Sequence, residues 1–156
     1  MTPRPSRLPD RSYLKLLETS AIDARRRELE SLGFATLVLP KTGVDGATFF
    51  DAARSTLPLD PPVYDSWDAL SDSLWEGLHQ HPSRRLAIVW QGTSEMARSW
   101  PTEFTRVMDV LSDVAALLGD PKATVGNPKE LVVLVERPEV GRRPGWPTKP
   151  RTWDRP

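Results

Sequence analysis

The chain contains no cysteine among its 156 residues, which excludes disulfide bonds, thiolate zinc sites and a cysteine nucleophile. Its 21 Lys and Arg residues equal its 21 Asp and Glu residues, so it lacks the overall basic field typical of nucleic-acid-binding proteins. No apolar run approaches the ~20 residues of a membrane span, and residues 1–5 do not begin a secretory signal. We therefore expect a soluble cytoplasmic protein, monomeric, with no membrane contact and no direct nucleic-acid contact.

Signatures of catalysis and cofactor binding are also missing. The chain has neither a phosphate-binding loop nor a dinucleotide-binding glycine motif. His79 and His81 are its only histidines, and their i, i+2 spacing places them on different faces of a helix, which makes a poor metal pair. No serine occurs in a recognisable nucleophile triad. We expect a protein that is not an enzyme, with no catalytic residues, no metal and no cofactor.

The zero net charge conceals a separation of charge along the chain. Residues 1–30 have seven basic and five acidic side chains, residues 31–136 have eight and fourteen, and residues 137–156 have six and two. The last 20 residues also contain five prolines, which is typical of a flexible segment that cannot form a core. The sequence predicts a mostly helical N-terminal extension over 1–34, a folded domain over 35–136 and a flexible Pro/Arg-rich C-terminal tail.

Three short apolar runs, residues 35–39, 86–90 and 131–135, predict strands. The runs are continuous rather than alternating, which is typical of strands covered on both faces. The gaps between them, about 40 residues each, are too long for hairpins and suit helical crossovers. We expect an α/β fold in which a small three-stranded parallel sheet packs with helices. The predicted helices are residues 12–18, 20–32, 45–57, 65–79 and 101–118.

The helix predicted over 65–79 has an unusual charge distribution. At ~100° per residue its apolar side chains fall in one narrow sector. They are Trp67, Leu70, Leu74 and Leu78. Its acidic side chains fall roughly opposite, at Asp65, Asp68, Asp72 and Glu76. From residue 57 to residue 83 the chain has five acidic residues and no Lys or Arg, so the carboxylates have no partner within the helix.

Three interpretations of this acidic helix remain open on pattern alone. The first is a solvated face whose early acids complement the helix dipole, and it is the usual one for such a helix. The second is a carboxylate pair for acid–base catalysis, although no nucleophile or metal motif accompanies it. The third is a surface for a cationic partner, since a basic cleft would relieve the repulsion between the carboxylates and steer association.

The run Y-x-x-W-D-A-L-x-D-x-L, starting at Tyr64, resembles the barstar family of intracellular inhibitors of the ribonuclease barnase. The resemblance covers about residues 35–136 and includes the strand LAIVW, the long amphipathic helix and the final strand LVVLV. It implies a barstar-like fold in β-α-α-β-α-β order. It also implies that the acidic helix and the loop before it plug a ribonuclease active site, where the carboxylates stand in for RNA phosphates.

The resemblance further implies which residues contact the partner. Asp68 and Asp72 match the two aspartates of the family's acidic helix, and Tyr64 matches an aromatic residue in the preceding loop. Asp113 stands where the family has a glutamate that reaches the enzyme. The predicted partner-binding residues are Asp72, Asp68, Tyr64, Asp65, Ser71, Trp75, Glu76 and Asp113.

The sequence departs from the family pattern near the predicted site. The loop before the acidic helix is one residue shorter and lacks the family's Gly and Asn. Ser71 replaces an aromatic residue between the two aspartates, and Trp75 offers an aromatic ring one turn later. We expect an inhibitor of the bacterial immunity or antitoxin type that blocks a secreted ribonuclease or related nuclease toxin. The alternative is a non-inhibitory protein-interaction module on the same fold.

Overall fold

The computed structural model describes residues 13–39 and 46–138 of the chain. Four parallel strands form one sheet in the order β1-β4-β3-β2. The strands are β1 (Leu14–Leu17), β2 (Ala35–Leu39), β3 (Arg85–Trp90) and β4 (Glu130–Glu136). The last three confirm the predicted strands and the parallel arrangement.

Five helices connect the strands within the described residues: α1 (Thr19–Ser31), α2 (Gly46–Thr56), α3 (Trp67–Gln80), α4 (Ser94–Ser99) and α5 (Pro101–Leu118). Four of them confirm predicted helices, and the short α4 was not predicted. No described helix is both long enough and apolar enough to cross a membrane. Beyond Arg137 and Pro138, the predicted C-terminal tail lies outside the described residues.

The prediction of a helix over residues 12–18, and with it that of a three-stranded sheet, is wrong. Leu14–Leu17 is the edge strand β1, which pairs with β4 in the register Leu14↔Val133. Leu14 and Leu16 are buried while Lys15 and Leu17 are half-buried, so the burial follows the period of two that a strand imposes. The N-terminal segment therefore contributes a fourth strand to the sheet.

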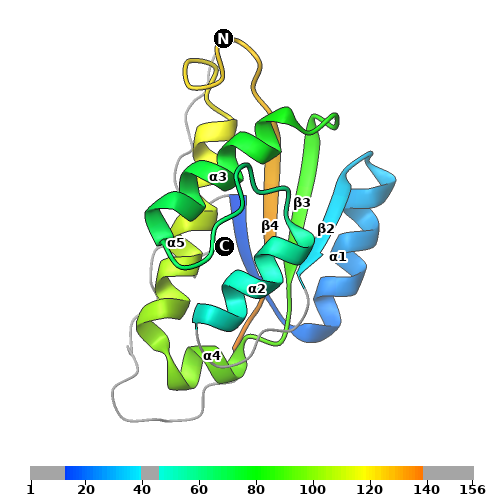
Figure 1. Cartoon of the computed structure of the whole chain (residues 1–156). Helices are drawn as coiled ribbons and strands as arrows, with labels where there is room; N and C mark the ends of the chain where they lie inside the picture. Colours follow the sequence, from blue (N-terminus) through cyan, green and yellow to red (C-terminus); the bar gives the residue numbers. More distant parts are fainter. Residues whose placement is uncertain (1–12, 40–45, 139–156) are drawn as a thin grey trace.

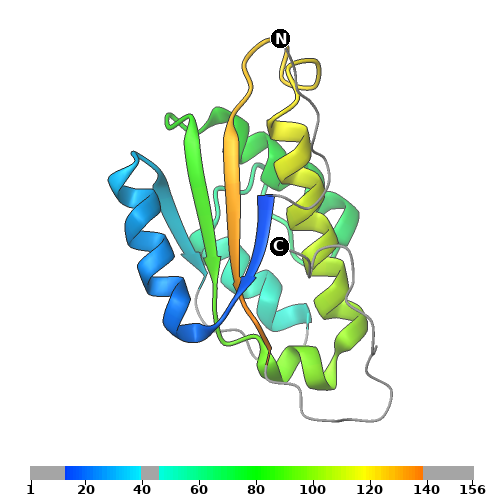
Figure 2. The same ribbon diagram turned by 180° about the vertical axis from the view of Figure 1, so that it is seen from behind.

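Helices cover both faces of the sheet, with α1 on one side and α2, α3 and α5 on the other (Figure 1 and, from behind, Figure 2). Alternate residues of β3 divide between the two cores. Leu86, Ile88 and Trp90 pack with α2, α3 and α5, whereas Ala87 and Val89 pack with α1. Burial on both faces explains why β3 is apolar at every position from Leu86 to Trp90.

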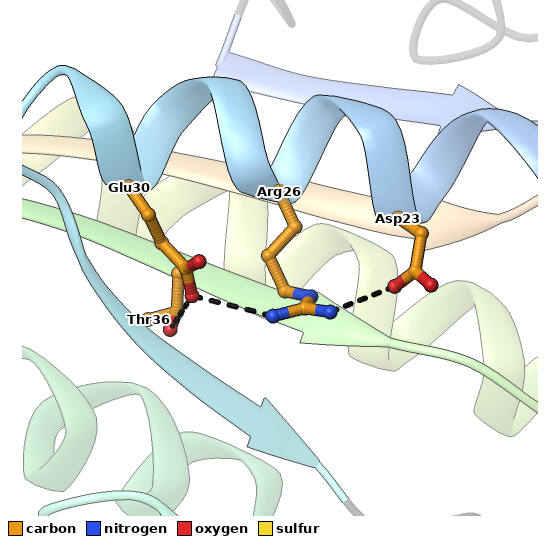
Figure 3. A network of polar contacts seen from close by, with 4 residues as sticks. All are labelled: Asp23, Arg26, Glu30 and Thr36. Carbon is orange, nitrogen blue, oxygen red and sulfur yellow. Dashed lines mark hydrogen bonds and ion pairs between the residues drawn. The ribbon is translucent and has the colours of Figure 1, made fainter.

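A polar network joins one side of α1 to β2, as Figure 3 shows. Arg26 pairs with Asp23 at 2.8 Å and with Glu30 at 3.3 Å, and Glu30 accepts a hydrogen bond from Thr36 on β2. The hydrogen bond from Arg26 holds the pKa of Asp23 below its usual value. The arginines in this stretch of α1 therefore form ion pairs on a solvated side of the helix. Exposed ion pairs of this kind add little stability.

Candidate partner-binding surface

The acidic helix α3 begins at a well-formed cap. The Ser66 hydroxyl accepts a hydrogen bond from the backbone N–H of Ala69 at 3.1 Å, which satisfies one of the free donors of the first turn. Asp68 lies in that turn, where a negative charge complements the helix dipole. The local sequence therefore fixes both the start of the helix and the place of its first carboxylate.

The loop before α3 is bound closely to the side of the helix. Backbone N–H of Asp60 donates to the carbonyl of Ser73 at 3.2 Å, and the buried Ser73 hydroxyl donates to the carbonyl of Pro61. Gly77 lies one turn further along, and a Cβ there would be only 1.3 Å from the carbonyl oxygen of Pro58. Loop and helix therefore form one unit, because the missing side chain of Gly77 lets their backbones touch.

An open groove of about 540 Å³ lies between this loop and α3. It is lined by residues 60–66 of the loop and by Ala69, Asp72, Ser73 and Glu76 of the helix. Four of the lining residues carry carboxylates, and none carries a positive charge. The groove is therefore a concave surface with a negative field, which favours a cationic group.

The carboxylates at this surface are not neutralised by the described part of the molecule. Asp65, Asp68 and Asp72 are exposed, and no ion pair among residues 13–39 and 46–138 involves them. Glu76 is half-buried and accepts a hydrogen bond from the neutral side chain of Gln80. The acidic side chains of α1 are different, because Asp23, Glu28 and Glu30 pair with arginines of the same helix.

Tyr64 is held at the rim of the groove by an arginine from α2. The Arg54 guanidinium carbon lies 4.2 Å from the centre of the Tyr64 ring, and Arg54 donates to the carbonyl of Val63 at 3.0 Å. Arg54 also pairs with Asp51. One side of the ring is thus supported while 67 % of the residue stays exposed, so Tyr64 is an aromatic group available to a partner.

The structure brings together only part of the predicted set of binding residues. Tyr64, Asp65, Asp72 and Glu76 line the groove, and Asp68 is exposed on α3 outside it.

The other three predicted residues lie elsewhere. Ser71 and Trp75 are half-buried on α3, and the Trp75 ring packs against the core and stacks on His79 at 4.7 Å. Asp113 is exposed on α5 and does not line the groove. That these eight residues contact a partner stays a prediction.

Sequence analysis missed the loop residues that form the other wall of the groove, above all Asp60, Pro61 and Pro62. The sequence carried a usable signal, since an Asp-Pro-Pro run bends the chain and stands close to the acidic helix. It could not show that the loop folds back along α3, because that contact depends on Gly77 and Ser73 further on.

The two histidines occupy separate places. His79 stacks on Trp75, whereas the Nδ1 atom of His81 accepts a hydrogen bond from the backbone N–H of Ser83 at 3.0 Å. No group of three or more potential metal ligands occurs in the described parts of the chain.

We expect His81 to make the protein less stable in mild acid. Burial, and then the charge of Lys129, lower the pKa of His81 below 6.5, so the unfolded chain takes up the proton more readily than the folded one. The stability that His81 contributes is complete above pH 6.5 and declines as the pH falls through the lowered pKa. Melting temperatures should therefore fall more from pH 7.5 to 5 in the wild type than in His81→Asn, which keeps an acceptor but does not titrate. Parallel pH profiles would contradict this role.

Comparisons with known proteins identify the family of the chain. The family model described as Barstar (barnase inhibitor) matches residues 36–133, which include α3, the loop before it, all of β3 and part of β2 and β4. Searches of curated proteins and of solved structures give no significant match. Since the family match covers more than half of the 156 residues, the chain belongs to the barstar family, with β1 and α1 added before the matched region.

Proposed function

We propose that this protein inhibits a ribonuclease, or a related nuclease toxin, by inserting α3 and the loop at residues 60–66 into the basic active-site cleft of the enzyme. The observation that carries the proposal is the set of exposed carboxylates, Asp65, Asp68 and Asp72, without ion pairs among the described residues. Barstar-family members are barnase inhibitors rather than enzymes, and this supports a protein partner of the same kind.

The chemistry of the surface favours a cationic cleft. Asp68 and Asp72 are one helical turn apart, so their charges repel each other in the free protein. A cleft lined with Arg and Lys side chains relieves this repulsion and replaces the water around each carboxylate by charge-assisted hydrogen bonds. An enzyme that binds RNA phosphates offers such a cleft, and the carboxylates then occupy the places of the phosphates.

We further propose that the protein acts as a monomer in the cytoplasm, where it protects the cell that makes a secreted enzyme. The test is an assay of RNA cleavage by barnase and by other small basic ribonucleases, each titrated with the full chain. Stoichiometric loss of cleavage supports inhibition. If the protein instead captures partners that are not nucleases, and does so equally well after substitution of Asp68 and Asp72, it is a non-inhibitory interaction module.

Association with the enzyme should be strongly dependent on salt. Exposed charges act over ~8 Å at physiological ionic strength and over ~30 Å at 0.01 M, so the negative groove attracts a basic enzyme most at low salt. We expect the association rate constant to fall at least ~10-fold between ~0.02 M and ~0.5 M NaCl, with a smaller change in the dissociation rate.

Stopped-flow fluorescence measures this effect, and the Asp65→Asn/Asp68→Asn double variant is its control. The amides keep the shape of the side chains but remove two charges, so the double variant should show a clearly shallower salt dependence. Equal slopes for the wild type and the double variant would show that these carboxylates do not guide association.

A further inference from the structure

A buried lysine meets the far end of the acidic helix. Lys129 immediately precedes β4 and is 5 % exposed. Its ammonium donates hydrogen bonds to the carbonyl oxygens of Leu78, at 3.0 Å, and of His81. No carboxylate among the described residues pairs with it. Two backbone carbonyls, rather than an acidic side chain, therefore hold this cation in the interior.

Leu78 lies in the last turn of α3 and His81 is its C-cap residue. The last C=O groups of a helix lack intrahelical partners, and the Leu78 carbonyl accepts the backbone N–H of His81, at 3.1 Å, in addition to Lys129. The end of a helix also carries partial negative charge, which a cation stabilises. The backbone N–H of Lys129 donates to the carbonyl of Leu118, the last residue of α5, at 2.7 Å. Lys129 thus joins the ends of α3 and α5 to the start of β4, at the same end of the molecule in Figure 1.

The position of this cation leaves the acidic surface charged. Leu78 and His81 follow Asp72 by six and nine residues, which corresponds to about 9 Å and 13 Å along a helix, and no ion pair among the described residues joins Lys129 to a carboxylate. A lysine within one turn of Asp68 or Asp72 would also stabilise the helix, but it would neutralise the carboxylates. Lys129 stabilises α3 from its C-terminal end, where it does not neutralise Asp68 or Asp72.

We propose that Lys129 is a positioning residue that fixes the end of α3 against β4 and thereby sets where Asp68 and Asp72 stand relative to the groove. The loop holds one side of α3 through Ser73 and Gly77, and Lys129 holds its C-terminal end. The consequence for binding rests on the proposed function, whereas the consequence for α3 itself does not.

The energetics agree with this role. Burial, and then the charge of Arg84, lower the pKa of Lys129, so the ammonium is unfavourable in this place unless the carbonyls of α3 bind it. Without the lysine the carbonyls of Leu78 and His81 lose their shared donor. Leu78 then keeps only the backbone N–H of His81, and we expect the last turn of the helix to fray.

The first test is native-state hydrogen exchange on the full chain, which needs no partner. In Lys129→Met we expect the amides of Gly77–Gln80 to lose protection about 10-fold to 100-fold more than the amides of β3. Lys122→Met, which removes an exposed lysine from the turn after α5, is the matched control and should leave both sets unchanged. An equal loss of protection throughout the molecule, or no loss in α3, would overturn the proposal.

The second test is binding to a ribonuclease that the wild type inhibits. Lys129→Met should raise the Kd about 10-fold, mainly through faster dissociation, while the salt dependence of association stays unchanged because no surface charge is lost. A Kd within twofold of the wild type, for a variant that is fully folded at the assay temperature, contradicts positioning.

The two tests separate the possible failures. If the wild type inhibits no ribonuclease, the proposed function fails. If α3 nevertheless loses protection selectively in Lys129→Met, the role of Lys129 in positioning the end of α3 still holds. If Lys129→Met does not fold, Lys129→Gln takes its place in both tests. The glutamine amide still donates one hydrogen bond, so we expect a smaller selective loss of protection in α3 and a smaller rise in Kd. The absence of both changes overturns the proposal.

Discussion

Replacing Asp72 with alanine is expected to weaken binding of the inhibited ribonuclease at least ~100-fold, measured as the Kd by calorimetry or surface plasmon resonance. Asp72 lines the groove, is exposed in the free protein and has no ion pair among the described residues. In the complex its removal leaves a buried cation of the enzyme without a partner. Truncating one member of a buried charge pair costs about 2–5 kcal/mol, a range that rests in part on the barnase–barstar complex itself. A loss of ~2.7 kcal/mol corresponds to a 100-fold rise in Kd.

The same substitution should leave the thermal melt almost unchanged. The Asp72 side chain makes no ion pair within residues 13–39 and 46–138, and its loss removes repulsion from Asp68 worth about a few tenths of a kcal/mol. Glu28→Ala is the matched control, since it removes one negative charge from α1, on the opposite face of the sheet. If both variants bind as tightly as the wild type, or both weaken equally, the groove is not the centre of the interface.

Replacing Gly77 with alanine should destabilise the protein by ~3 kcal/mol or more. The new Cβ would lie 1.3 Å from the carbonyl oxygen of Pro58, which is backbone and cannot rotate away. Loop and helix must move apart, which breaks the hydrogen bonds of Ser73 with Asp60 and Pro61 and opens the groove. Overpacking costs of 1–3 kcal/mol are typical, and a backbone collision lies at the upper end or beyond it.

Urea denaturation measures this effect, with Gly119→Ala as its control. A Cβ at Gly119 would meet the Tyr13 hydroxyl at 3.1 Å, and that hydroxyl is the far end of a side chain that can shift. We expect Gly119→Ala to change the free energy of unfolding by no more than ~1 kcal/mol. Equal effects of the two substitutions would show that loop and helix are not held in contact at Gly77.

Much of the sheet could be predicted because its central strands are buried on both faces. The runs around Ile88 and Val133 are apolar at every position, and this pattern is typical of a covered parallel sheet. The edge strand β2 has one polar residue, Thr36, but keeps the β-branched and apolar character of a strand. β1 could not be identified in the same way. Its four residues, LKLL, form helices as readily as strands, and their pairing partner β4 lies more than 100 residues away.

The prediction covered the helix wall of the acidic groove but only Tyr64 and Asp65 of its loop wall. Helical periodicity places Asp68 and Asp72 on a common solvent face, because the opposite face must bury Leu70 and Leu74. The other wall depends on a loop that turns back onto α3, and Lys129 reaches the helix from across the fold. Local sequence patterns describe single elements, so contacts between elements distant in the chain lie outside what they predict.

The kinetics of RNA cleavage by an inhibited ribonuclease test the central claim most directly, since the claim is that carboxylates of α3 occupy the RNA-binding cleft. Cleavage of a short RNA is followed at several RNA concentrations while the full chain is added in steps. We predict that the onset of inhibition slows as the RNA concentration rises, by a factor of one plus the ratio of the RNA concentration to KM, because RNA and α3 compete for one cleft. An onset rate that does not depend on RNA concentration, or unchanged inhibition by Asp68→Asn/Asp72→Asn, would contradict the claim.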